Sequence, residues 1–118
     1  MTPDLPTAVA SLRLAGGDIT SIEVKAASGG LPESLTSTLS ALANLPGGGL
    51  IILGLDERAG FRPVPLADPQ ALKQGLAAKA RGFIPPVRLE IEDGTVDGSP
   101  VVVAQVSECD RSAKWSTP

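Results

Sequence analysis

Asp18, Glu23 and Asp56 are three carboxylates near two predicted strands, and divalent cations prefer carboxylate oxygens as ligands. Glu23 and Lys25 are two positions apart in an alternating segment, so their side chains are expected on one face of a strand. Asp18 begins that segment, and Asp56 follows the apolar segment that should form the neighbouring strand. Carboxylate oxygens converging there could bind Mg²⁺ or Mn²⁺. Solvated strand charges, or an ion pair of Lys25 with Glu23 or Asp56, explain the same pattern, and both interpretations stay open.

Cationic side chains in the middle and second half of the chain could instead bind phosphate. No acidic residue occurs from Gln70 to Leu89, although the whole chain has a formal net charge of −3. Sequence-independent binding to nucleic acid depends on a positive surface, so here it would have to come from a local patch. Ordinary solvated positions on an amphipathic helix explain the same cations. The candidate phosphate contacts are Arg58, Arg62, Lys73, Lys79, Arg81 and Arg88.

The composition excludes several common functional classes. The chain has no histidine, which removes the usual general base of serine and cysteine hydrolases. A single cysteine, Cys109, can form no internal disulfide and cannot anchor a zinc site. The longest apolar run, Leu50 to Leu55, is far shorter than the roughly 20 residues of a membrane-spanning helix. We therefore expect a cytoplasmic protein that does not bind membranes and has no resident cofactor.

Apolar residues recur at helical spacing in three segments, each with start and stop signals. Asp4 and Asp68 precede the first and third segments and are plausible N-caps, as is Thr7 for the first. The prolines of Ile84-Pro85-Pro86 cannot continue the third helix. The predicted helices run from about Leu5 to Gly16, from Pro32 to about Asn44, and from Pro69 to before Ile84.

Other segments have the pattern of strands. Leu50 to Leu53 is apolar on both faces, which is typical of a central strand covered on both sides. Val87 to Ile91 alternates and should pair antiparallel with Val101 to Val106, with Asp93-Gly94 and Asp97-Gly98 in the connection. These elements predict an α+β fold, a mixed β-sheet with about three helices in the order β-α-β-β-α-β-β.

The glycine run Gly47 to Gly49 follows a predicted helix and precedes a strand. A phosphate-binding loop runs in the other direction, from strand to helix, and ends in a Lys-Ser or Lys-Thr pair. The run therefore predicts a tight turn that lets backbone segments pack closely.

Five segments, in order along the chain, resemble the Schlafen-type AlbA-like domain. That family has an acidic residue, a Glu-x-Lys strand, a helix ending Ala-x-Ala-Asn or similar, a Gly-Gly turn, an apolar strand ending Gly-x-Asp, and a Pro-Pro strand. The matching segments cover nearly the whole chain and are Ile22 to Lys25, Leu31 to Leu35, Thr38 to Asn44, Gly47 to Asp56 and Ile84 to Val87.

The resemblance implies a DNA-binding domain, usually the N-terminal part of bacterial transcriptional regulators that are often labelled divergent AAA-type or helicase-related proteins. In animal Schlafen relatives the corresponding acidic residues form a metal-dependent RNA-cleaving site, and the matching positions are Asp18, Glu23 and Asp56. Asp18 stands where the family usually has Glu. That nuclease also depends on a duplicated lobe, whereas this chain has one copy.

We therefore expect residues 1–118 to be one domain, an N-terminal fragment of a longer protein, that binds DNA in a bacterial transcriptional regulator without catalysis. The first alternative is a nuclease that uses Mg²⁺ or Mn²⁺ at the three carboxylates. The second is a protein-interaction or oligomerisation domain with incidental cations. A homodimer is a further expectation, since the chain ends soon after its last predicted strand.

Overall fold

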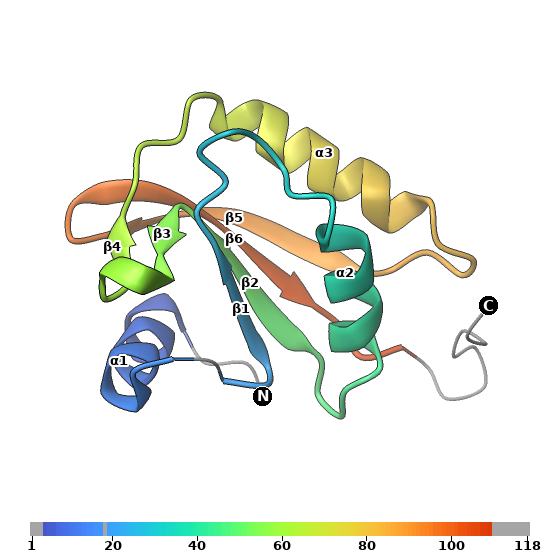
Figure 1. Cartoon of the computed structure of the whole chain (residues 1–118). Coiled ribbons are helices and arrows are strands. Elements are labelled where there is room, and N and C mark those ends of the chain that lie inside the picture. Colours follow the sequence, from blue (N-terminus) through green and yellow to red (C-terminus); the bar gives the residue numbers. More distant parts are fainter. Residues whose placement is uncertain (1–3, 18, 110–118) are drawn as a thin grey trace.

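The computed structural model describes residues 4–17 and 19–109, which form a four-stranded sheet with helices on both faces (Figure 1). The strands are β1 (Ile22–Lys25), β2 (Gly49–Leu53), β3 (Leu55–Asp56), β4 (Arg62–Pro63), β5 (Leu89–Val96) and β6 (Ser99–Val106). The main sheet has the order β1-β2-β6-β5, with β1 parallel to β2 and β6 antiparallel to both of its neighbours. A separate ladder joins β3 to β4. The predicted α+β fold with a mixed sheet is confirmed.

Four helical segments occur in the described part of the chain, and two of them begin at the predicted caps. They are α1 (Leu5–Ala15), α2 (Leu35–Ala43), the short 3-10 helix η1 (Glu57–Ala59) and α3 (Pro69–Arg81). The Asp4 carboxylate accepts from the backbone N–H of Thr7 (3.1 Å), and the Asp68 carboxylate accepts from that of Ala71 (3.0 Å). Each bond satisfies a donor that the helix itself leaves unpaired. None of these helices is long and apolar enough to cross a bilayer.

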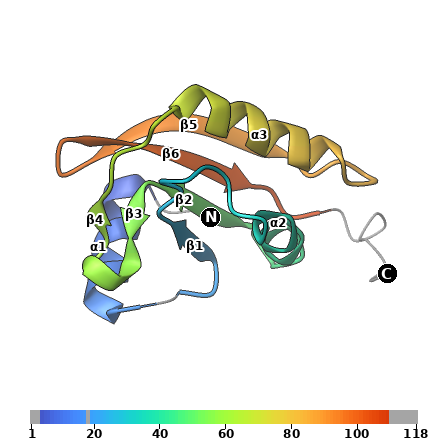
Figure 2. The same cartoon turned by 45° about the horizontal axis from the view of Figure 1, so that its top comes forward.

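The sheet separates two apolar cores, which explains why β2 is apolar on both faces. Ile51 and Leu53 pack with α2 and α3 on one side, whereas Leu50 and Ile52 pack with α1 on the other. All four side chains are at most 1% exposed. Figure 2 shows α2 and α3 on one face of the sheet and α1 on the opposite face. The central, doubly covered strand predicted from the sequence is confirmed.

Several predicted boundaries differ from the structure, among them the starts of β5, at Leu89 instead of Val87, and of β6, at Ser99 instead of Val101. The strand expected to start at Asp18 starts at Ile22, and the helix expected to start at Pro32 starts at Leu35 after a turn. Gly94 was predicted in a connection but lies inside β5, paired with Val101. A glycine is needed at this position because Leu5 of α1 packs where a Cβ would be. The hairpin turn is Asp97-Gly98 alone, with both residues at positive φ as tight hairpins require.

The glycine run forms the predicted tight turn between α2 and β2. Gly48 has φ +73°, and a Cβ there would overlap the carbonyl oxygen of Val106 on β6. A Cβ on Gly49 would lie 2.6 Å from Leu42 Cδ2, so α2 also packs directly on this backbone. The Glu108 carboxylate accepts from the backbone N–H of Gly47 (3.0 Å). The run therefore joins α2, β2 and the end of β6 by close contact.

Candidate nucleic-acid interface

The C-terminal end of α3 carries two of the six candidate cations. Leu72, Leu76 and Ala80 are buried against the sheet and define the inward side of the helix. Because successive residues are about 100° apart around a helix, the neighbours of Ala80 lie on its two flanks. Lys79 is on one flank and half-buried, and Arg81 is on the other and exposed. Cations in a last helical turn also interact favourably with the helix dipole, so position alone does not imply binding.

Arg88 reaches the same end of the molecule through the loop that follows α3. The backbone N–H of Val87 donates to the carbonyl of Ala80 (3.0 Å), and the Val87 side chain is buried. Arg81 and Arg88 each directly follow one of these two hydrogen-bonded residues, so their backbones lie at the same end of the molecule. On the other side, the N–H of Ser107 donates to the Arg88 carbonyl (3.0 Å). We call Lys79, Arg81 and Arg88 the α3-end cations.

Within residues 4–17 and 19–109, the α3-end cations form no ion pair. The chain from Gln70 to Leu89 holds no carboxylate that could neutralise them locally. Arg81 and Arg88 are also exposed, so their guanidinium groups are free to contact an anion. Arg81 and Arg88 thus place two positive charges without an ion-pair partner in the described part of the chain at this end of the molecule, with Glu90 and Glu108 as the exposed carboxylates next to Arg88 along the chain and across its backbone bond to Ser107.

Lys73 differs from the other cations of α3 because it already has an anionic partner. Its Nζ lies 3.0 Å from Asp93 Oδ2 and 3.1 Å from Oδ1, which ties α3 to β5. The Lys73 side chain is 24% exposed. A phosphate would have to compete with the Asp93 carboxylate for this ammonium group.

Arg58 and Arg62 lie at a different place, on η1 and β4. Figures 1 and 2 both show η1 and β4 at one end of the molecule and the C-terminal end of α3 at the other. Both arginines are exposed, but carboxylates lie among them: Asp56 is opposite Arg62 in the β3–β4 ladder, and Glu57 precedes Arg58. The six candidate cations therefore lie in two separate regions, one at η1 and β4 and the other on α3 and its following loop, and the second region has no acidic residue in its own sequence from Gln70 to Leu89.

Glu23 and Asp56 are the two proposed metal ligands among the described residues, and each has another partner. Glu23 Oε1 lies 3.0 Å from Lys25 Nζ, the ion pair that was one of the two interpretations. The Asp56 carboxylate accepts from the backbone N–H of Arg58 (3.0 Å) and so caps η1. β1 places Glu23 beside Ile51, whereas Asp56 comes only after the bend at Gly54. Asp18 lies outside the described residues, and those that are described form no cluster of three or more Asp, Glu, Cys or His fit to hold a metal.

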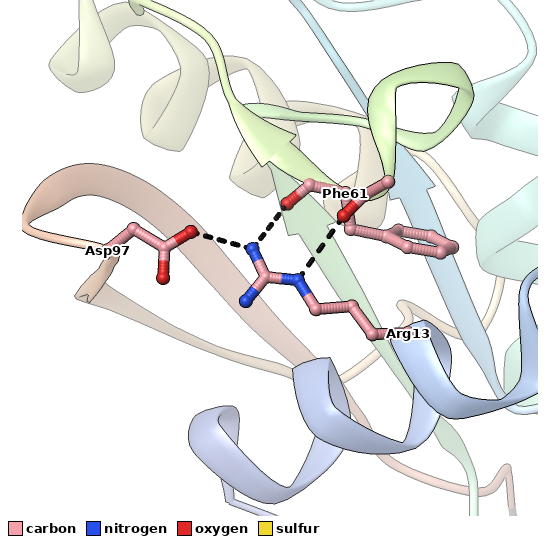
Figure 3. A network of polar contacts seen from close by, with 4 residues as sticks. Arg13, Phe61 and Asp97 are labelled. Carbon is pink, nitrogen blue, oxygen red and sulfur yellow. Dashed lines mark hydrogen bonds and ion pairs between the residues drawn. The ribbon is translucent and has the colours of Figure 1, made fainter.

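A polar network centred on Arg13 was not anticipated from the sequence. From α1, its guanidinium donates to the carbonyls of Gly60 (3.2 Å) and Phe61 (3.1 Å) and to the Asp97 carboxylate (2.7 Å; Figure 3). The bond from Arg13 lowers the pKa of Asp97 below its ordinary value. No sequence signal identifies these contacts, because their partners lie 47 to 84 positions away along the chain.

Two solved structures from bacteria are similar to this chain. The solution structure of the N-terminal domain of a RecG-related protein from Nitrosomonas europaea, named after an ATP-dependent DNA helicase, is 30% identical. The similarity covers 90% of this chain and 76% of that one, with a TM-score of 0.68. The DIP2311 protein from Corynebacterium diphtheriae shares the fold at 20% identity and a TM-score of 0.55, and the match covers 87% of this chain but 26% of that one.

No curated protein matches the sequence significantly. The family described as Schlafen, AlbA_2 matches residues 18–116, most of the chain, which agrees with the motifs that suggested it. This match, over the sheet, α2 and α3 together, shows that the chain belongs to the Schlafen AlbA_2 family.

Proposed function

We propose that this domain is a non-catalytic DNA-binding module of a cytoplasmic bacterial transcriptional regulator, and that the α3-end cations contact the phosphate backbone. The observation that carries the proposal is the C-terminal end of α3 with its following loop, where the half-buried Lys79 and the exposed Arg81 and Arg88 have no ion-pair partner among the described residues. The family, and the DNA helicase in the name of the solved Nitrosomonas relative, support a role with nucleic acid.

The charge distribution favours this end of the molecule over the other faces. The exposed edge strand β5 carries Glu90 and Glu92 on the side of the sheet away from α3, where their carboxylates would repel phosphate. Arg88 alternates onto this same side, so it marks the limit of the positive surface. Arg58 directly follows Asp56 and Glu57, and Arg62 lies opposite Asp56 in the β3–β4 ladder. DNA is therefore expected to approach the end of α3 and its following loop. Contacts to phosphate set the position of the protein on the duplex and carry no sequence information.

The experiment is a fluorescence anisotropy titration of a labelled duplex over a salt series. Each phosphate neutralised contributes about 0.9 to the slope of log affinity against log salt concentration. The double variant Arg81→Gln/Arg88→Gln should bind more weakly, with a slope smaller by about two. The matched control Arg58→Gln/Arg62→Gln removes the same charge at the other end and should change the slope less. Undetectable binding of the unmodified protein at low salt would refute the proposal.

The same samples test the non-catalytic part of the proposal. Structured RNA and duplex DNA, incubated with the protein and Mn²⁺, are expected to remain full length. Cleavage that disappears in the Glu23→Gln variant would support the nuclease alternative instead. Cleavage that persists unchanged in that variant would identify a contaminating nuclease.

We also propose that the module forms a homodimer, in which case the sheet edge at β1 is the favoured contact. The other edge, β5, carries Glu90, Glu92 and Asp93, and like charges along an edge strand oppose pairing with a second copy. β1 carries Glu23 and Lys25, one charge of each sign. Light scattering over a concentration series would measure the mass, and a constant monomer mass would rule the dimer out.

A further inference from the structure

We infer that Ile84, at the tip of the loop after α3, is an apolar wedge that inserts between stacked base pairs of duplex DNA. The inference rests on the proposed function and adds a second kind of contact to it. Arg81 and Arg88 would hold the phosphates, while the Ile84 side chain enters the base stack between them.

Ile84 is presented to solvent to an extent that is unusual for a large apolar side chain. It is 90% exposed, and Leu14, at 91%, is the other such residue in the described part of the chain. Single exposed apolar residues are common on protein surfaces, so exposure alone is not evidence of a site. The surroundings of the two residues differ, and this difference carries the argument.

The loop around Ile84 is held in place on both sides. Before it, Phe83 packs against the core beneath α3, and its backbone N–H is directed at the Ala80 carbonyl (3.4 Å). After it, Pro85 and Pro86 have restricted φ angles, and Val87 is buried and bonded to the same carbonyl. Ile84 is therefore the outward point of a short, constrained segment. A constrained tip loses little conformational freedom when it binds.

The charges around the two exposed residues also differ. Ile84 lies in the chain between Arg81 and Arg88, which have no ion-pair partner among the described residues. Leu14 follows Arg13, whose guanidinium is occupied by Asp97 and two backbone carbonyls. Only the Ile84 tip thus combines an apolar point with cations that are available for phosphate, within the described residues.

The chemistry of the tip favours a duplex over a single strand. Single-stranded nucleic acid is usually bound by aromatic side chains on which bases stack. The aromatic residue next to this tip, Phe83, is turned to the core instead. Branched aliphatic side chains such as Ile act differently, because proteins that bend DNA insert them as wedges between base-pair steps and unstack them.

The test uses the full chain and duplexes that carry 2-aminopurine at flexible TA steps, since this base fluoresces more strongly when it is unstacked. The unmodified protein should raise the fluorescence on binding. Ile84→Ser should abolish that rise and weaken binding about tenfold, with the salt slope unchanged. The matched control Leu14→Ser removes an equally exposed apolar side chain and should behave as the unmodified protein. Circular dichroism would verify that both variants are folded.

The outcomes separate the inference from the proposed function. If Ile84→Ser binds and unstacks as the unmodified protein does, while the arginine variants lose affinity, the wedge is wrong and the phosphate contacts stand. If none of these variants changes binding, both proposals fail. The last outcome is that the unmodified protein does not unstack DNA but binds anionic phosphatidylserine vesicles, and that Ile84→Ser loses this vesicle binding. That result would overturn the inference in favour of a lipid surface.

Discussion

Arg13 in α1 and Asp97 in the turn between β5 and β6 form an ion pair of 2.7 Å across 84 positions of sequence. The same guanidinium binds the carbonyls of Gly60 and Phe61, so one side chain joins α1, the segment after η1 and the hairpin turn (Figure 3). These three segments surround the core on the α1 face, in which Phe61 is buried. Arg13 therefore helps to fix α1 on the sheet.

Replacing Arg13 by Met should lower the free energy of unfolding by about 1 kcal/mol, because the two backbone carbonyls lose a charged donor. Arg13→Lys should recover part of the loss, since an ammonium group can reach fewer of these acceptors at once. Urea denaturation followed by circular dichroism measures both values. An unchanged unfolding midpoint in Arg13→Met would show that the network does not contribute to stability.

Acidification should weaken the same network. The hydrogen bond from Arg13 lowers the pKa of Asp97 in the folded protein, whereas the unfolded chain has the ordinary value of about 3.9. The stabilisation is thus fully present well above pH 4 and is lost as the pH falls through the lowered pKa of the folded state. Asp97→Asn should remove this part of the pH dependence. Thermal unfolding between about pH 6 and pH 2 gives the midpoint temperature of the unmodified protein and of Asp97→Asn. If the midpoint falls equally with pH in both proteins, the prediction is wrong.

Gly16 and Gly48 have the same left-handed backbone conformation but different surroundings, so substituting each one tests backbone strain and steric overlap separately. Both have φ +73°, but a Cβ on Gly16 would meet nothing within 4 Å, whereas one on Gly48 would overlap the Val106 carbonyl. Gly16→Ala should therefore cost about 1 kcal/mol, the penalty of left-handed backbone alone. Gly48→Ala should cost more than about 3 kcal/mol or prevent folding, because β2, β6 and the turn would have to separate. Equal losses in chemical denaturation would contradict the close approach.

Two lysines of α3 allow a comparison of a paired with an unpaired cation. Lys73 is bound to Asp93, whereas Lys79 has no ion-pair partner among the described residues. Lys79→Gln should decrease the salt slope of DNA binding by about one, and Lys73→Gln should decrease it by less. A larger effect at Lys73 would mean that DNA displaces Asp93 and lies further along α3 than we propose.

Local sequence patterns were sufficient to predict most elements of this fold. The Asp4 and Asp68 caps, the buried stripes of the helices and the fully buried β2 are all as predicted. Such features depend on residues within a few positions of one another, so periodicity and capping rules capture them. Gly94 was misassigned for a different reason: its role is to let Leu5 approach, and Leu5 is distant in sequence.

In the candidate site, too, some features follow from local sequence and others from contacts between distant segments. From the sequence alone, the family, the kinds of residue and the absence of acidic residues from Gln70 to Leu89 were already evident. The tertiary structure decided that the six cations lie in two groups, that Lys73 is neutralised by Asp93, and that Arg13 rather than any predicted residue organises the α1 face. Sequence spacing specifies which side of a helix or strand a residue occupies. Which side chains from distant segments then meet depends on how those segments pack together.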